Sequence, residues 1–206
     1  MSSSAIRDIQ IALFSLGYDP QGIDGIFGDR TRAATERWLA AGGVSARVHP
    51  AAADYPVRQG SAGYPVTEIC IHCSATRGEW MATSELPAQV AEIRRWHVQG
   101  NGWSDIGYHW LVGRRGSTMA GRPEDRIGAG VEGHNRGVIH ICLIGGHGSS
   151  KTDDFSDHFT AAQDTALRRL IEDISMRADI TRISGHNEYA AKACPGFSVP
   201  AWLKGA

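Results

Sequence analysis

The chain has 206 residues, with 21 lysines and arginines against 22 acidic residues and a formal net charge of −1. This length allows one domain of ordinary size plus a small one. The balanced charge leaves no basic stripe for a nucleic-acid backbone, so we expect no nucleic-acid partner. No stretch approaches the roughly 18 apolar residues of a membrane span, and the start of the chain lacks a signal-peptide pattern. We therefore expect a soluble protein made in the cytoplasm, without membrane insertion and monomeric by default.

The first predicted elements are two short helices. Over residues 4–16 the apolar side chains recur three or four positions apart, which is typical of an amphipathic helix, and Gly17 closes it. Glycines and a proline then punctuate residues 18–28. Asp29 offers an N-cap for a second helix that runs through Trp38.

A change of composition marks the predicted domain boundary. Residues 42–65 are rich in Ala, Gly, Pro and Ser and show no periodicity, which is typical of a linker. We therefore predict a small all-α domain over residues 1–42, a linker over 43–65 and a second domain over 66–206.

Strand-like and helix-like segments alternate in the second domain. The expected strands are 69–73, 108–112 and 138–144, and the expected helices are 87–98 and 160–177. This order predicts an α/β fold in which helices cover a sheet. Segment 138–144 is almost continuously apolar, so we predict a strand that is buried on both faces at the centre of the sheet.

Candidate metal ligands occur near the C-terminus. The chain has nine histidines, and a single histidine is more often an ordinary residue than a ligand. His186 and Cys194 stand eight residues apart, and both residue types bind zinc well. By themselves they are equally consistent with a loop histidine and a buried cysteine. A catalytic zinc site needs three protein ligands and an open position, and His72 in the strand 69–73 is the candidate third ligand.

The other cysteines and histidines carry weaker signals. The four cysteines are too few and too scattered for a disulfide scaffold. Cys70 and Cys73 form a C-x-x-C pair, but strand alternation sends their thiols to opposite faces and no second pair completes a zinc ribbon. A cytosolic redox protein that uses this pair is a separate hypothesis, which predicts sensitivity to alkylation without a metal requirement. The histidines interpreted as non-ligands are His97, His109, His134, His140 and His147.

Six motifs in order carry a family resemblance. They are Ile71-His-Cys-Ser-Ala-Thr76, Trp96-His97, Gly102-Trp-Ser-Asp-Ile-Gly-Tyr-His109, Gly121-Arg-Pro123, Cys142-Leu-Ile-Gly-Gly146 and Lys192-Ala-Cys-Pro195. The set resembles the amidase-2 family, which includes bacteriophage lysozyme-amidases and the animal peptidoglycan recognition proteins. The resemblance covers residues 66 to about 203.

The resemblance implies a fold, a metal site and an activity. The implied fold is a central mixed β-sheet flanked by helices, and the implied cofactor is one zinc ion held by His72, His186 and Cys194. Tyr108 and Lys192 occupy the family's two catalytic positions. The implied enzyme is an N-acetylmuramoyl-L-alanine amidase, which hydrolyses the amide between the lactyl group of N-acetylmuramic acid and L-alanine of peptidoglycan. The alternative is a non-catalytic peptidoglycan-recognition protein, against which Cys194 and Lys192 argue.

The chemistry of amide hydrolysis agrees with these roles. Zinc lowers the pKa of a bound water to about 7 and polarises the carbonyl oxygen. Lys192 stands two residues before Cys194, so in an extended turn its ammonium projects toward the metal and can stabilise the oxyanion. The Tyr108 hydroxyl can orient the water or assist proton transfer. Without the motifs, Tyr108 would be interpreted as a core tyrosine and Lys192 as a solvated lysine.

The start of the chain carries a second resemblance, to the small helical peptidoglycan-binding domain often attached to wall hydrolases. The matching residues are Asp8, Gln10, Leu13, Leu16-Gly-Tyr18, Gly22-Ile-Asp-Gly-Ile-Phe-Gly28, Thr31 and Ala34. Trp38-Leu39 departs from the aromatic–glutamine pair that usually ends the last helix. The alternative is a purely structural pair of helices. A wall hydrolase without an export signal is expected to be a phage or prophage endolysin that acts on the cell wall after release.

Overall fold

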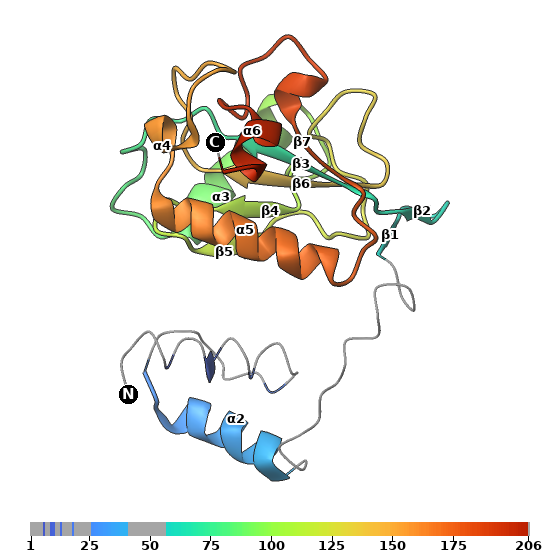
Figure 1. Cartoon of the computed structure of the whole chain (residues 1–206). Coiled ribbons are helices and arrows are strands. Elements are labelled where there is room, and N and C mark those ends of the chain that lie inside the picture. Colours follow the sequence, from blue (N-terminus) through green and yellow to red (C-terminus); the bar gives the residue numbers. More distant parts are fainter. Residues whose placement is uncertain are drawn as a thin grey trace. The chain divides into compact units, whose positions relative to one another are not determined.

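The computed structural model of the chain divides into two compact units, Met1–Ala51 and Ala52–Ala206 (Figure 1). The residues that it describes are 26–40 and 57–205, together with Ile6, Ile9, Gln10, Leu13 and Tyr18. Most of the predicted first helix and of the predicted linker therefore lies outside the described residues. No helix within the described ranges is long and apolar enough to cross a membrane.

Helix α2 (Asp29–Ala40) is the described helix of the first unit, and it begins at the residue where the sequence predicts a helix start. The carboxylate of Asp29 lies in the first turn, where the helix dipole favours a negative charge. The side-chain amide of Gln10 donates to Thr31 Oγ1 at 2.9 Å and to the carbonyl of Ile26 at 3.2 Å. Gln10 and Thr31 are both buried, so these bonds join the start of the chain to α2.

The second unit is built on a five-stranded mixed sheet in the order β5-β4-β6-β3-β7 (Figure 1). Its strands are β3 (Glu68–Cys73), β4 (Trp110–Val112), β5 (Thr118–Ala120), β6 (Val138–Leu143) and β7 (Arg182–Gly185). Strands β4, β6, β3 and β7 are parallel, and β5 is antiparallel. Strand β6 lies at the centre with every residue buried, as its apolar sequence predicts. The predicted α/β fold with a central mixed sheet and flanking helices is confirmed.

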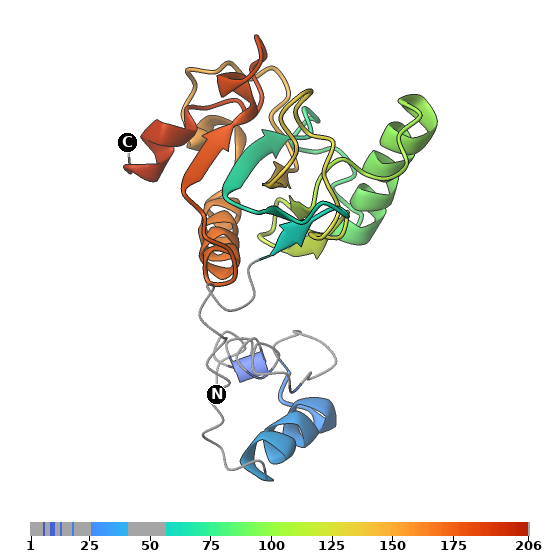
Figure 2. The same ribbon diagram turned by 90° about the vertical axis from the view of Figure 1, so that its right-hand side faces the viewer.

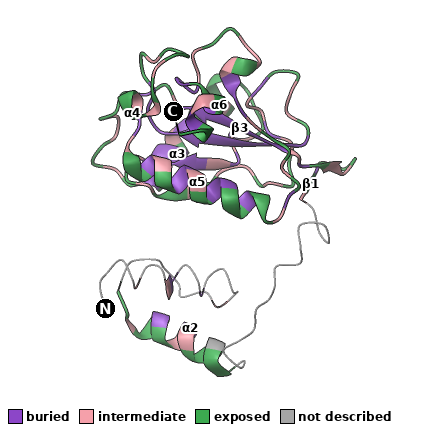
Figure 3. Cartoon of the chain, viewed as in Figure 1, coloured by how far each residue is buried: buried purple, intermediate pink, exposed green. Residues whose placement is uncertain are grey.

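Helices cover both faces of this sheet. Helix α5 (Ala161–Ser175) and the short α6 (Val199–Leu203) lie on one face, and α3 (Leu86–Arg95) lies on the other (Figures 1 and 2). The remaining short helices are α4 (Phe155–His158), a π-helical turn (Trp96–Gly100) and a 3-10 turn (His186–Glu188). Figure 3 shows that the inner side of α5 and strand β3 are buried while the outer side of α5 is exposed, and every residue of β6 is buried as well. Burial of these apolar surfaces is the main stabilising contribution, at about 25 cal/mol per Å².

Alternation along β3 divides its side chains between two environments. Ile69, Ile71 and Cys73 pack in the core under α5. Cys70 and His72 face the other side, so the two thiols of the C-x-x-C pair lie on opposite faces, as predicted. All of these side chains are almost completely buried. One face of β3 is thus apolar core, and the other carries polar groups that need partners.

Two predicted elements in the second unit include residues that have a different backbone structure. The helix expected over 87–98 ends at Arg95 and continues as the π-helical turn. The strand expected over 108–112 begins only at Trp110. Backbone pairing continues before Trp110, because the N–H of His109 donates to the His140 carbonyl at 2.9 Å, but the pairing there is irregular. Strands β5 and β7, of three and four residues, were not predicted, because segments so short show little periodicity.

The linker predicted over residues 43–65 is wrong for its last eight residues, 58–65, which form regular structure. Strands β1 (Arg58–Gln59) and β2 (Tyr64–Pro65) form an antiparallel hairpin. Gln59 is buried, donates to the carbonyl of Val138 at 3.0 Å and accepts from the N–H of Gly137 at 2.9 Å. Gly60 and Gly63 contribute to the linker-like composition, but they belong to the hairpin turn, where both adopt positive φ. Residues 58–65 therefore belong to the second unit.

Candidate metal centre

His72 and His186 meet because β3 and β7 are parallel neighbours. Ile71 is paired with Gly185, so the next residue of each strand follows at the same edge of the sheet. The two imidazole rings lie with their centroids 4.9 Å apart. In α/β folds this edge, at the carboxyl ends of parallel strands, is where ligands usually bind.

Cys194 joins this pair from the C-terminal loop. Its Sγ lies 3.8 Å from Nδ1 of His72, and the ligand atoms of His72, His186 and Cys194 all lie within 4.8 Å of one another. Ligand atoms in a tetrahedral zinc site lie about 3.3 to 3.6 Å apart, given the usual zinc–nitrogen and zinc–sulfur bond lengths. A contraction of about 1 Å would therefore bring all three onto one ion. Two imidazole nitrogens and one thiolate sulfur also form a donor set that suits zinc.

The surroundings of the three candidate ligands shift their pKa values in different directions. Burial lowers the pKa of His72 well below its usual value, and burial followed by the charge of Lys192 lowers that of His186. Both rings therefore stay neutral at pH 7, as metal ligation requires. A hydrogen bond with the Cys73 side chain, together with burial, raises the pKa of the Cys194 thiol well above its usual value. The backbone N–H of Cys73 also donates to Cys194 Sγ at 3.3 Å and fixes the position of the sulfur.

The two predicted catalytic side chains lie beside this cluster. The Tyr108 ring centroid lies 5.2 Å from those of both His72 and His97. Burial raises the pKa of Tyr108 well above its usual value, so its hydroxyl keeps its proton at neutral pH. Lys192 is exposed, and its charge acts on the nearby His186. The structure thus brings together all five residues that the sequence singled out.

A groove of about 650 Å³ opens next to His186 and Lys192, within the usual size range of ligand sites. Its lining residues are Trp103, Ala129, Gly130, Val131, Glu132, Asn135, His186, Tyr189, Ala190 and Lys192. A smaller hollow of about 250 Å³, between residues 78–89 and 113–117, is lined by none of the predicted site residues. The groove is therefore the better candidate for a substrate site.

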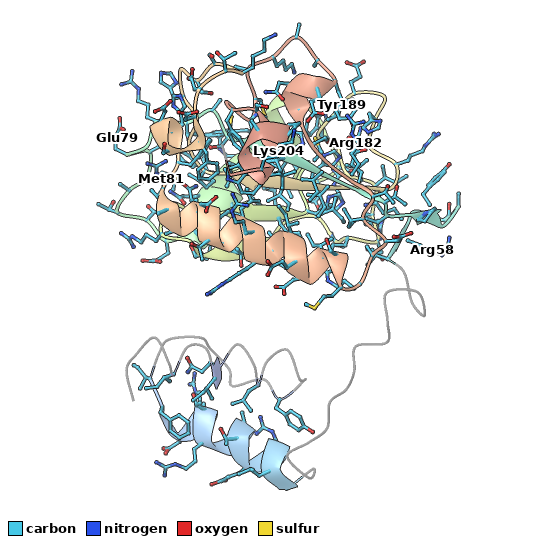
Figure 4. The ribbon with its side chains drawn as sticks, viewed as in Figure 1. Arg58, Glu79, Met81, Arg182, Tyr189 and Lys204 are labelled. Carbon is cyan, nitrogen blue, oxygen red and sulfur yellow. The ribbon has the colours of Figure 1, made fainter. Side chains whose placement is uncertain are left out.

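Glu68 holds Tyr189, one of the residues that line the groove, in place. Its carboxylate accepts hydrogen bonds from the hydroxyls of Tyr189 and Ser184, and from Nε2 of His134 at 2.9 Å. Figure 4 labels Tyr189 and Arg182, whose guanidinium lies 5.3 Å from the tyrosine ring centroid. This network is not predicted from the sequence, because its members come from β3, β7 and two loops and no local pattern connects them.

A second contact that is not predicted from the sequence involves His140, one of the histidines expected to be a non-ligand. Its Nδ1 lies 3.0 Å from Nε2 of His72. The two histidines share a sheet face because β3 and β6 are parallel neighbours, with Cys70 paired to His140 and His72 to Cys142. Alternation within β6 could have shown that His140 faces away from α5, but the pairing of the strands could not be known from the sequence.

A comparison with family models shows which family the chain belongs to. The profile described as N-acetylmuramoyl-L-alanine amidase matches residues 62–197. The chain belongs to this amidase family. The family and the class of enzyme predicted from the sequence are thereby confirmed.

Similar proteins include phage endolysins. The endolysin of Klebsiella phage KP32 is 35% identical over 136 residues, which cover 66% of this chain and 84% of that protein. The endolysin of Escherichia phage T7 is 38% identical over 140 residues, which cover 65% of this chain and 83% of that protein. Both matches are long enough to include most of the relative.

Solved structures share the amidase fold. Bumblebee PGRP-SA superposes with a TM-score of 0.57 at 29% identity, covering 68% of this chain and 81% of that one. Peptidoglycan recognition protein LE, solved in complex with tracheal cytotoxin, a monomeric diaminopimelic acid-type peptidoglycan, has a TM-score of 0.54 at 26% identity, covering 69% of this chain and 79% of that one. The amidase LysC of Clostridium intestinale matches in fold, with a TM-score of 0.51 at 24% identity over 66% of this chain and 80% of that one.

Proposed function

We propose that the chain is a zinc-dependent N-acetylmuramoyl-L-alanine amidase that hydrolyses the amide between the lactyl group of N-acetylmuramic acid and L-alanine. The observation that carries this proposal is the cluster of His72, His186 and Cys194 ligand atoms within 4.8 Å of one another. His186 also lines the groove of about 650 Å³, which is within the usual size range of ligand sites. A peptidoglycan substrate is supported by the related structure that contains a peptidoglycan fragment.

His72, His186 and Cys194 would hold the zinc ion. When bound, zinc supplies a Lewis acid for the scissile carbonyl and lowers the pKa of a water molecule into the neutral range. The protein's own contribution is to keep both imidazoles neutral through burial and to fix the sulfur with the N–H of Cys73. Hydrogen bonds from neighbouring groups to the ligands of a metal site orient those ligands.

Lys192 and Tyr108 act on the substrate in this proposal. The ammonium of Lys192 stands at the groove, where it can stabilise the negative charge that develops on the carbonyl oxygen. The Tyr108 hydroxyl stays protonated, so it can donate a hydrogen bond or a proton to the reacting group. The rings of His72 and His97 flank Tyr108 and limit the positions of its ring.

The biological role that we propose is that of a phage or prophage endolysin acting on the bacterial cell wall. The similarity to phage endolysins over most of their length supports it. We also propose that residues 1–42 form a peptidoglycan-binding domain. Tethering would raise the local concentration of the amidase at an insoluble polymer.

The test uses the full chain and isolated peptidoglycan. The purified protein is incubated with sacculi as prepared, after chelation, and after chelation followed by zinc or by magnesium. Mass spectrometry assigns the released ends. We expect free stem peptides that begin at L-alanine, lost on chelation and restored by zinc but not by magnesium, since thiolate and imidazole ligands suit zinc.

The same assay separates the enzyme from a binding protein. Sacculi that are bound but never cut, even with zinc supplied, would support the non-catalytic recognition protein. Cleavage within the glycan or inside the stem peptide would contradict the proposed bond specificity.

A further inference from the structure

Both ring nitrogens of His72 have a neighbour. Nδ1 faces Sγ of Cys194 at 3.8 Å, and Nε2 lies 3.0 Å from Nδ1 of His140. The second distance is that of a hydrogen bond between two imidazoles. His72 therefore contacts the proposed metal site with one nitrogen and a second histidine with the other.

A neutral imidazole carries one proton, so the role of one nitrogen fixes the role of the other. When Nδ1 of His72 binds a metal, its proton resides on Nε2 and is donated to Nδ1 of His140. We propose that His140 is a positioning residue, which holds His72 in the tautomer and orientation that present Nδ1 to zinc. This inference rests on the proposed zinc site. A partner of this kind on the second nitrogen of a ligating histidine orients the ring and strengthens its binding.

The chain leaves space for this hydrogen bond. A Cβ atom at Gly130 would lie 2.5 Å from Nδ1 of His140 and 2.8 Å from Nε2 of His72. A Cβ atom at Gly128 would lie 2.4 Å from Cδ2 of His140. Any larger residue at these positions would displace one of the two rings. The loop is thus free of side chains at the two places where they would break the contact.

The backbone of His140 is also fixed. Its N–H donates to Nδ1 of His109 at 2.9 Å, and the two rings stack with centroids 5.7 Å apart. On the outer side of this pair, Nε2 of His109 lies 2.9 Å from the carbonyl of Arg126. The position of the His140 ring relative to His72 is therefore determined by the fold on both sides.

His140 is an unfavourable residue to bury unless it has a role. It is completely buried, and within the described part of the chain its Nε2 has no hydrogen-bond partner. In the proposed arrangement this Nε2 carries the proton, and an unpaired buried N–H destabilises a fold. An apolar residue on β6 would avoid this cost. The hydrogen bond to His72 supplies a reason for an imidazole at this place.

A competing arrangement uses the same atoms. Cys70, His72 and His140 form a second group whose potential ligand atoms lie within 4.8 Å of one another. All three residues are completely buried, and none of them lines the groove that His186 borders. A second ion at this place is an alternative that the zinc stoichiometry distinguishes.

The test compares two substitutions of His140 in the full chain. His140→Asn keeps an acceptor, because the Oδ1 of asparagine lies close to where Nδ1 of histidine lies, whereas His140→Leu removes it. Both variants remove the unpaired Nε2. Zinc affinity is measured by competition with a chromophoric chelator. We expect His140→Leu to bind zinc roughly 10- to 100-fold more weakly than the wild type, and His140→Asn to stay within about threefold of it.

Ile141→Ala is the matched control for packing. Ile141 is buried on the same strand but faces α5. This variant should unfold at a lower temperature without a change in zinc affinity beyond about threefold. Equal losses of zinc affinity in Ile141→Ala and His140→Leu would overturn the proposal, because the effect would then be one of general stability.

A readout without metal tests the tautomer directly. Long-range 1H–15N NMR spectra of the metal-free wild type should show His72 with its proton on Nε2, and this readout does not depend on any variant folding. A proton on Nδ1, wild-type affinity in His140→Leu, or two zinc ions per chain would each overturn the inference. A wild type that binds no zinc would overturn the proposed function as well, whereas equal binding by wild type and His140→Leu would overturn this inference alone.

Discussion

Sγ of Cys194 lies 3.8 Å from Nδ1 of His72, although the two residues are 122 positions apart in the chain. Only the folded chain brings them together, so a metal that binds both must stabilise the fold. Zinc at a free concentration 100-fold above its Kd should add about 2.7 kcal/mol to the free energy of unfolding. Thermal or urea unfolding with and without zinc checks this.

Cys194→Ser should remove most of this stabilisation. Loss of a ligand should weaken zinc binding by more than the roughly 10- to 100-fold that an outer partner contributes, and hydrolysis should fall with it. Cys70→Ala is the matched control, since it removes another buried thiol that the proposed site does not use. If Cys70→Ala loses zinc as strongly as Cys194→Ser, the ligand assignment is wrong. The measurements are chelator competition and release of stem peptides.

Lys192→Met should reduce kcat about 10²- to 10³-fold while zinc affinity stays unchanged. The substitution removes a cation next to the developing oxyanion and leaves the three ligands in place. Lys204→Met is the control, because Lys204 is another exposed lysine near the C-terminus (Figure 4). A loss confined to KM would instead indicate that Lys192 binds the substrate without stabilising the transition state.

Tyr108→Phe should lower kcat about 10²- to 10⁴-fold, the range typical of a lost general acid or base. The phenylalanine ring can still pack between His72 and His97, so the fold and zinc binding should persist. Tyr64→Phe removes a hydroxyl in the β1–β2 hairpin and serves as the control. A kcat within about threefold of the wild type would show that the Tyr108 hydroxyl handles no proton in the rate-limiting step.

The ligand set could be proposed from the sequence because it rests on local motifs. His72 follows apolar residues of a strand, and Cys194 stands in the motif Lys192-Ala-Cys-Pro195. The partners of these residues could not be proposed in this way. The contact of His140 with His72 depends on the register of β3 against β6, and a shift of one residue would send His140 to the other face.

The fold likewise contains elements that the sequence pattern indicates and elements that it does not. The continuous apolar run of β6 indicated the centre of the sheet, and a strong helical period indicated α5 (Ala161–Ser175). The hairpin over residues 58–65 was mistaken for a linker, because the glycines of a tight turn and those of a flexible segment look alike in the sequence. The difference lies in Gln59, whose buried hydrogen bonds attach the hairpin to Gly137 and to Val138, the first residue of β6.

Glu68→Gln should destabilise the second unit by about 1–3 kcal/mol at pH 7, because it breaks a buried hydrogen-bonded carboxylate. Burial alone would raise the pKa of Glu68, but hydrogen bonds from Ser184, Tyr189 and His134 outweigh it and the pKa is lowered. The carboxylate therefore stabilises the fold fully above its unfolded-state pKa of about 4.3, and this contribution is lost as the pH falls through the lower folded-state pKa.

Urea denaturation of wild type and Glu68→Gln at a series of pH values from 7 downward measures this. The difference in the free energy of unfolding should be largest near pH 7 and should shrink below about pH 4. Glu172→Gln, at an exposed position on α5, should show little difference from the wild type at any pH of the series. A difference for Glu68→Gln that stays constant with pH would mean that the loss comes from packing and not from the charge.

The proposed wall-binding role of residues 1–42 predicts a loss that depends on the substrate. A chain that begins at Ala52, the boundary between the two compact units, should lose at least about tenfold in kcat/KM on insoluble sacculi, because a tether to a polymer raises the local concentration of the amidase. On a soluble muropeptide the shortened chain should work as well as the full one, since no second site is available there to bind. Initial rates on the two substrates check this. Equal losses on both would show that the first unit supports the fold of the second, and no loss on either would leave the first unit without a role in binding the wall.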